Sequence, residues 1–198
     1  MSEFPLPDPT DTAAYDKALA KSVVGGPKPL AAPIEICDYD LAWPELYERE
    51  AARIRAALGP RVVRLEHAGS TSVPTLPAKP IIDILLEVPD SADEPSYVPD
   101  LEAAGYTLRT READWFEHRM FRGPDTRVNL HVYTAGCVEV ERMLLFRDWL
   151  RANAADRERY AAVKRELATR DWKYGQQYAD AKTAIIQEIM ARAEAAAR

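Results

Sequence analysis

One segment of the chain constrains both its fold and its chemistry. Residues 67–80 form a loop of small, polar and proline residues that leads directly into the apolar run 81–88. A run of consecutive apolar residues predicts a strand that is covered on both faces. Asp83 lies near the start of that run, and a carboxylate on an apolar strand is costly unless another group pairs with it. Together, the loop and the carboxylate indicate a phosphate or nucleotide site.

The loop offers several groups that can hold phosphate. They are Gly69, Ser70, Thr71, Ser72 and Lys79. Backbone amides and hydroxyls would bind the phosphate oxygens, and the lysine would add positive charge. Asp83 is suited to a hard cation such as Mg²⁺ or Mn²⁺. The alternative is structural, a proline-stiffened connection in which Asp83 caps loop amides, and the residues alone leave both interpretations open.

A second polar group is expected further along the chain. Asn129, His131 and Tyr133 alternate with apolar residues, so they should share one face of a strand. His131 can act as a metal ligand, a general base or a phosphate donor. His67 offers the same chemistry immediately before the loop. Either histidine can equally be a structural residue whose ring is satisfied by a neighbour.

Two tyrosine–lysine pairs are expected on C-terminal helices. Tyr160 and Lys164 are four residues apart, as are Tyr178 and Lys182, and this spacing places each pair on one helix face. An aromatic ring beside an ammonium group suits a nucleotide base and its phosphates. It also suits simple packing, in which the lysine stem covers the ring.

The pattern of apolar residues and breakers predicts an α+β fold, in which a mixed sheet is followed by a helical block. Residues 1–32 are expected to form an extension, and residues 33–198 one domain. The predicted strands are 34–37, 62–66, 81–88, 106–109, 115–121 and 127–133. The predicted helices are 11–22, 43–58, 100–104, 138–153, 155–170 and 174–196.

Charge and hydropathy narrow the function classes. The net charge of −6 argues against a broad nucleic-acid-binding face, which must be basic. No apolar run reaches the ~18 residues of a membrane span. Residues 1–10 lack the basic and apolar regions of a secretory signal, so we expect a cytoplasmic protein. The sequence gives no indication of oligomeric state.

With these residues identified, most of the chain, about residues 34–191, resembles the GrpB family of uncharacterised bacterial proteins. The motifs that carry the resemblance are Tyr39-Asp40-x-x-Trp43-Pro44, His67-x-Gly69-Ser70-Thr71-Ser72-Val73-Pro74-x-Leu76-x-Ala78-Lys79-Pro80-Ile81-Ile82-Asp83-Ile84, Leu130-His131-Val132, Phe146-Arg147-Asp148-x-Leu150-Arg151 and the two tyrosine–lysine pairs. Thr75 departs from the family, which usually has glycine there. The family also resembles an accessory domain fused to some dephospho-CoA kinases.

The resemblance extends to the fold of the nucleotidyltransferases of the DNA polymerase β superfamily. It implies that Gly69 and Ser70 lie at the phosphates and that Asp83 is the first metal-binding carboxylate. The second carboxylate of that pattern falls at Leu85, which cannot bind a metal, and the third falls near His131. Because a two-metal site needs bridging oxygen ligands, one carboxylate and one imidazole make a weaker magnesium site.

Two functions remain open from the sequence. The first is a nucleotidyltransferase-like enzyme that uses ATP or another NTP and a small-molecule hydroxyl or amine, or that activates a carboxylate with ATP at the same site. Asp83 and His131 would then be catalytic. Asp83, with His131 and His67 as further candidates, would hold the metal. The second is a non-catalytic module that binds a nucleotide or coenzyme, or assists a kinase.

Overall fold

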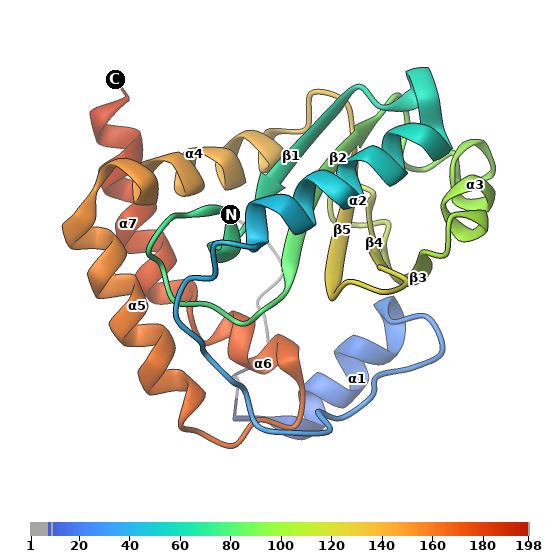
Figure 1. Cartoon of the computed structure of the whole chain (residues 1–198). Coiled ribbons are helices and arrows are strands. Elements are labelled where there is room, and N and C mark those ends of the chain that lie inside the picture. Colours follow the sequence, from blue (N-terminus) through green and yellow to red (C-terminus); the bar gives the residue numbers. More distant parts are fainter. Residues whose placement is uncertain (1–7, 9, 198) are drawn as a thin grey trace.

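A five-stranded mixed sheet lies at the centre of the computed structural model, which describes residue 8 and residues 10–197 (Figure 1). The strands are β1 (Arg64–Ala68), β2 (Ile82–Val88), β3 (Thr107–Glu112), β4 (His118–Arg122) and β5 (Val128–Thr134). Their order in the sheet is β1-β2-β5-β4-β3. β2 and β5 are parallel, and every other neighbouring pair is antiparallel. The two central strands therefore carry the predicted polar residues side by side.

One face of the sheet is covered by α2 (Trp43–Leu58) and α3 (Val98–Ala103). Helix α2 has Pro44 in its first turn, where the missing amide costs no hydrogen bond. It ends at Gly59, whose φ of 54° is easily reached by glycine. The main apolar core fills this side of the sheet, and the residues that β2 contributes are Ile82, Ile84, Leu86 and Val88.

The opposite face is covered by the C-terminal helices α4 (Val138–Ala152), α5 (Ala154–Ala168), α6 (Gly175–Asp180) and α7 (Thr183–Ala196) (Figure 1). Two smaller apolar clusters lie here. One joins Leu85 and Tyr133 of the sheet to α4, and the other joins Val73 and Leu76 of the loop to α4, α5 and α7. The predicted α+β arrangement, a mixed sheet followed by helices, is confirmed.

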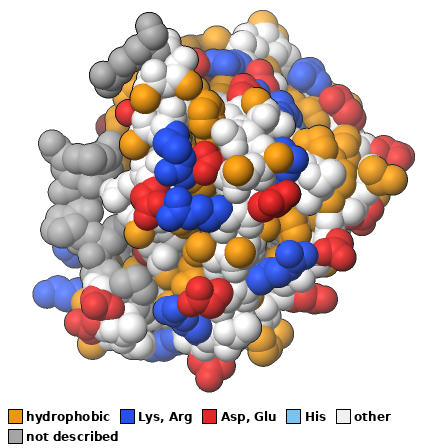
Figure 2. Space-filling model, turned by 90° about the vertical axis from the view of Figure 1, so that its left-hand side faces the viewer, with side chains coloured by type: hydrophobic (Ala, Val, Ile, Leu, Met, Phe, Trp, Pro, Cys, Tyr) orange, Lys and Arg blue, Asp and Glu red, His pale blue; other side chains and the backbone are white. Residues whose placement is uncertain are grey.

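The side of the molecule formed by these helices carries mixed charge. In Figure 2, lysine and arginine side chains are interspersed with aspartate and glutamate over this face. Ion pairs link α5 to α7, as between Arg159 and Glu188, 2.5 Å apart, and between Asp156 and Arg192, 2.6 Å apart. The face shown has no broad basic area of the kind that nucleic-acid binding needs. No helix in residues 10–197 is long and apolar enough to cross a membrane.

An additional helix, α1 (Thr12–Ser22), precedes the domain and packs beside α6 (Figure 1). Asp11 caps it by accepting a hydrogen bond from the amide of Ala14. Tyr15 is buried, and its hydroxyl donates to Asp180 over 2.6 Å. The amide of Leu30 also bonds to the carbonyl of Lys173. The described part of residues 1–32 is thus joined to the C-terminal helices.

Several predicted boundaries differ from the structure. The strand predicted at 34–37 is wrong, because only Cys37 forms a bridge, to Ala78 in the proline-rich loop, where few amides are free to extend a ladder. The first sheet strand begins at Arg64 instead of Val62, and β3 continues to Glu112.

Two further predictions fail at turns. The segment predicted as one strand over 115–121 starts with a turn, and Phe116 and Glu117 have positive φ, which a strand excludes. The helix predicted over 174–196 is two helices. The amide of Lys182 bonds to the carbonyl of Ala179, a tighter turn that separates α6 from α7.

Candidate functional site

The loop after β1 lies directly against Asp83. β1 and β2 are antiparallel, and Ala68, the last residue of β1, is the register partner of Asp83. Gly69 follows with a φ of 64°. A Cβ atom at this position would lie 2.2 Å from Oδ2 of Asp83, so only glycine lets the backbone approach so closely. The predicted meeting of the Gly69-Ser70 loop with Asp83 is therefore a feature of the structure.

The parallel pairing of β2 with β5 brings Asn129 and His131 to the same carboxylate. Asn129 is the register partner of Asp83 and donates from Nδ2 to its Oδ1 over 2.7 Å. Nε2 of His131 lies 3.9 Å from that oxygen. Burial opposes the charge of Asp83, but His131, Asn129 and Lys79 together outweigh it and lower the pKa of the carboxyl group. Asp83 is therefore held as a carboxylate.

The imidazole of His131 continues into a second pair of side chains. Its Nδ1 is hydrogen-bonded to Nε2 of His118 over 3.0 Å, and Nδ1 of His118 bonds to Glu112 over 2.7 Å. A chain of polar groups thus crosses the sheet from β2 to β3. Burial lowers the pKa of His118 although Glu112 raises it, so the neutral ring is favoured. Such a chain fixes the tautomer and orientation of His131.

Three lysine side chains lie around two tyrosine rings near Asp83. The Nζ atoms of Lys79 and Lys182 each lie 4.9 Å from the centre of the Tyr178 ring. The Nζ atom of Lys164 lies at the same distance from the Tyr160 ring and donates to the carbonyl of Pro77. Lys79, which comes from the loop before β2, thus shares the Tyr178 ring with Lys182, and its charge also acts on Lys164. We call Lys79, Lys164 and Lys182 the lysine cluster.

The lysine cluster is poorly compensated by negative charge. Burial, and then the charge of Lys182, lower the pKa of Lys79 to about 8 and that of Lys164 to about 6. Burial also lowers the pKa of Lys182, against the opposing effect of Asp83. The hydroxyl of Tyr178 is buried and has no hydrogen-bond partner among the described residues. Three lysines whose ammonium forms lack nearby negative charge, together with an unused donor, form a site that a polyanion would stabilise.

The hydroxyls of Thr71 and Ser72 are directed into the protein. Thr71 is 1% exposed, and its Oγ1 bonds to Nε2 of His67 and to the carbonyl of Ile81. Ser72 donates to the carbonyl of Gly69 over 2.6 Å. Their side chains hold the loop in shape. Ser70 instead lines a cavity together with His131 and Tyr160.

The structure places His67 on the opposite face of the sheet from Asp83. Its register partner is Ile84, and its ring stacks on Tyr47 with the ring centres 4.8 Å apart. Burial lowers the pKa of His67 to about 4. The ring is therefore a neutral part of the packed face, and it does not join Asp83 and His131 as a third ligand.

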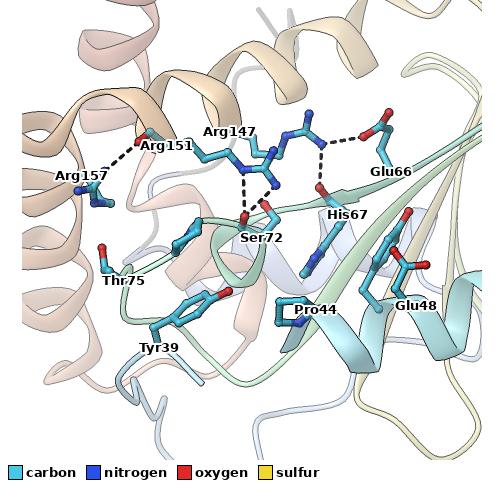
Figure 3. A pocket seen from close by; sticks show the side chains of 12 residues that line it. Tyr39, Pro44, Glu48, Glu66, His67, Ser72, Thr75, Arg147, Arg151 and Arg157 are labelled. Carbon is cyan, nitrogen blue, oxygen red and sulfur yellow. Dashed lines mark hydrogen bonds and ion pairs between the residues drawn. The ribbon is translucent and has the colours of Figure 1, made fainter. Parts of the chain in front are cut away.

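Two arginines of α4 hold the loop from its outer side (Figure 3). Arg147 donates to the carbonyl of His67 over 3.0 Å and to Glu66 over 2.8 Å. Arg151 donates from two nitrogens to the carbonyl of Ser72. They line an open hollow of about 680 Å³. Since their donors are used by the protein itself, these arginines fix the conformation of residues 67–72.

The residues available for a metal ion are few. In the part of the chain that the structure describes, no three His, Cys, Asp or Glu side chains are grouped as a metal ion would need. Asp83 and His131 supply two ligand groups, and Leu85 is buried in an apolar cluster. Mg²⁺ often takes one or two carboxylates, with substrate phosphates and water completing its shell. Asp83 fits that mode of binding better than a cage made of protein ligands alone.

Sequence reasoning gave His118 less weight than His131 and His67, and it missed Glu112. The turn at residues 123–126 indicates that β4 and β5 form an antiparallel hairpin. In that hairpin, Met120 is the register partner of His131. With that register, His118 lies on the same face, two residues along, beside Tyr133 and diagonal to His131.

Fold and site together define an α+β domain in which a glycine–serine loop, a strand carboxylate and the lysine cluster meet at one end of a mixed sheet. Residues 33–192 match the family model described as GrpB protein. The chain belongs to the GrpB family.

Relatives agree with this assignment. A UPF0157 protein from Halalkalibacterium halodurans is 59% identical over 192 residues, which is 96% of this chain and 98% of that one. A crystal structure of the conserved protein GrpB from Enterococcus faecalis has a TM-score of 0.70 and 32% identity, and covers 80% of this chain and 96% of that chain. A dephospho-CoA kinase from Mycolicibacterium paratuberculosis is 31% identical over 70% of this chain, which corresponds to 40% of the kinase.

Proposed function

We propose that the protein binds a nucleoside triphosphate at the lysine cluster and transfers its nucleotidyl group to a small-molecule hydroxyl or amine. The observation that carries this proposal is the contact of Gly69 with Asp83 beside three poorly compensated lysines. A triphosphate would supply the negative charge that the lysine cluster lacks, and an acceptor for the free hydroxyl of Tyr178.

Different residues would bind the nucleotide and act on the acceptor. The amides of Gly69 and Ser70 and the lysine cluster hold the phosphates, while the rings of Tyr160 and Tyr178 flank the lysines. Asp83 would hold Mg²⁺ or Mn²⁺ bound to the nucleotide, and that ion would neutralise phosphate charge. Residues that bind the nucleotide are thus separate from His131, which remains free to act on the acceptor.

In the proposed transfer, one bond to phosphorus forms as another breaks. The acceptor oxygen or nitrogen forms a bond to the α-phosphorus, the bond from that phosphorus to the β-phosphate oxygen breaks, and pyrophosphate leaves. His131 takes the proton of the acceptor at Nε2, while Nδ1 stays bonded to His118. With a carboxylate as acceptor, the same steps give an acyl nucleotide and need no base.

A second candidate is a binding module without catalysis. The specific observation in its favour is Leu85, which is 1% exposed and packs among apolar residues where a second carboxylate would be needed for two metal ions. The dephospho-CoA kinase relatives make coenzyme A a suitable probe for this alternative.

The test is a thermal-shift titration of the full chain with ATP, GTP, CTP, UTP and CoA, each with Mg²⁺, Mn²⁺ or EDTA. A ligand at about 100 times its Kd adds about 2.7 kcal/mol to the unfolding free energy. We expect a metal-dependent rise of Tm with at least one NTP, and its loss in Asp83→Asn and Gly69→Ala.

Matched controls separate the site from general damage. Asp171→Asn changes an exposed carboxylate. Gly26→Ala adds a methyl group at a φ of 78° where the new Cβ meets nothing within 4 Å. Both should bind like the wild type. The transferase proposal is rejected if no NTP shifts Tm, and a metal-independent shift with CoA alone supports the binding module.

A further inference from the structure

A cavity of about 550 Å³ lies between the polar end of the sheet and the helices α4, α6 and α7. Gly69, Ser70 and His131 form part of its wall, so it opens beside the proposed nucleotide site. Its volume is that of pockets that enclose small organic molecules. A molecule in this cavity would lie next to the imidazole that is proposed to take a proton.

Much of the wall is apolar or aromatic. These positions are Val73, Trp115, Tyr133, Met143, Phe146, Leu150 and Ile186. Trp115 and Tyr133 are in edge contact, with ring centres 6.2 Å apart. Aromatic faces attract cations as well as apolar groups. This part of the cavity favours the carbon skeleton of a ligand.

Two carboxylates in the wall have no cationic partner. Asp180 accepts hydrogen bonds from the hydroxyl of Tyr15 and the amide of Gln176, and Glu112 bonds to His118. Within residues 10–197, neither forms an ion pair with a lysine or arginine, since the ion pairs of the described chain give Glu112 only His118 and Asp180 none. Asp180 is thus held by neutral donors and by the more distant charge of Lys182, and Glu112 by an imidazole, so neither carboxylate is neutralised by a direct ion pair with a lysine or arginine of the described chain.

A third carboxylate in the same wall, that of Glu139, does have a cationic partner. Glu139 accepts two hydrogen bonds from Arg142, each 2.7 Å long, and is thereby neutralised. Burial raises the pKa of Asp180 against the opposing effects of its two hydrogen bonds and of the charge of Lys182, and the charge of Glu112 raises it further. Those two carboxylates are thus close enough to repel each other, which a cation between them would relieve.

Trp115, which forms part of the wall, also carries an unused hydrogen-bond donor. Nε1 of Trp115 is buried and has no partner among the residues that the structure describes. A buried donor left unpaired is costly, so this part of the wall is not optimised for stability alone.

We propose that this cavity binds an organic amine in its ammonium form, with an apolar or aromatic body, and that this amine becomes the acceptor after it passes one proton to Glu112 or Asp180, its second proton going to His131 during the attack. The ammonium group would lie at Glu112 and Asp180, and its carbon skeleton would lie along Trp115 and Phe146. The role as acceptor rests on the proposed function, whereas the binding does not. An anion would be repelled by the two carboxylates, and a neutral ligand would add no positive charge beside them.

The test compares ligands that differ in charge and little in shape. Phenethylamine, tyramine and tryptamine are titrated into the full chain by calorimetry, without nucleotide, beside 2-phenylethanol and 3-phenylpropionate. We expect the amines to bind at least about tenfold more tightly than the alcohol and the acid. This comparison uses the wild type only, so it does not depend on the folding of any variant.

Two variants then locate the site. Asp180→Asn and Glu112→Gln keep the shape of each side chain, and each should weaken amine binding about tenfold. Asp171→Asn, with an exposed side chain, should leave it unchanged. The inference is overturned if the acid or the alcohol binds as tightly as the amines, if both variants bind amines like the wild type, or if no amine binds at millimolar concentration.

Failure here is distinguishable from failure of the nucleotide proposal. If an NTP raises Tm in an Asp83-dependent way and no amine binds, the nucleotide site is supported and the amine site is rejected. If amines bind and no NTP changes Tm, the amine site is supported and the nucleotide site is rejected.

Discussion

The two faces of the central sheet come from the same strands but are built in opposite ways. On the α2 side, β2 contributes Ile82, Ile84, Leu86 and Val88, each at most 1% exposed and packed only into the apolar core. On the side of the C-terminal helices, β2 contributes Asp83, beside Asn129 and His131. Because strand side chains alternate between faces, a single strand supports both a continuous core and a polar site.

The difference teaches where stability and binding reside. The core face has few polar groups and gives folding energy in proportion to buried area. The other face holds poorly compensated lysines, a tyrosine hydroxyl without a partner among the described residues, and a cavity, all of which cost stability unless a ligand is bound. Substitutions that are similar in size should therefore have different effects on the two faces.

The largest expected effect is on the core face. Ile84→Ala should lower the unfolding free energy by about 2 to 5 kcal/mol, because it leaves a cavity at a fully buried position. Asp83→Asn, one residue away, should change it by about 1 kcal/mol or less but remove nucleotide binding. Urea denaturation measures both values. Equal losses of stability in the two variants would contradict the division between the faces.

An intermediate effect is expected from His67, the polar residue buried on the core face. Its pKa falls from 6.5 to about 4 on folding, so the neutral ring stabilises the fold above pH 6.5. That contribution is lost as the pH falls from 6.5 towards 4. At pH 4.5 the loss is about 2 to 3 kcal/mol, at about 1.4 kcal/mol for each pH unit.

The variant His67→Gln checks this linkage. Glutamine does not titrate, so the unfolding free energy of the variant should fall less steeply than that of the wild type between pH 7 and pH 4.5. Urea denaturation at a series of pH values gives the two slopes. Parallel curves would show that His67 is not the group responsible.

The smallest expected effect comes from removing one hydroxyl. Tyr178→Phe should change the unfolding free energy by less than about 0.5 kcal/mol, or raise it, because this buried hydroxyl has no partner in the described chain. Tyr106→Phe is the matched change on the core side. That hydroxyl donates to the buried Glu50 over 2.6 Å, and its loss should cost about 1 to 3 kcal/mol. Thermal unfolding of both variants measures the difference, and equal costs would contradict it.

The sequence predicted the parts of this fold in which local pattern and tertiary structure agree. The apolar run of β2, the helix α2 with Pro44 and Gly59 at its ends, and the meeting of the loop with Asp83 are examples. The family resemblance supplied the register that connects Asp83 with His131. Thr75 was identified as the departure from the family, and its φ of 68° explains why glycine is usual there.

Other features depend on contacts that a single sequence does not display. The inward direction of the Thr71 and Ser72 hydroxyls follows from the carbonyls and the His67 ring around them. The break between α6 and α7 lies in a segment without glycine or proline, so no strong helix breaker marks it. The pairing of His118 with His131 needs the hairpin register as well as the alternation of side chains.

The junction of α1 with α6 has a consequence for the time course of folding. Tyr15 and Asp180 are separated by 165 positions, and Lys173 joins Asp16 across 157. During synthesis, α1 therefore leaves the ribosome long before the residues that hold it exist. Contacts between such distant positions form slowly, because a long loop must close first. Since Asp180 also lines the cavity, that wall cannot be complete until α6 has been synthesised and has met α1.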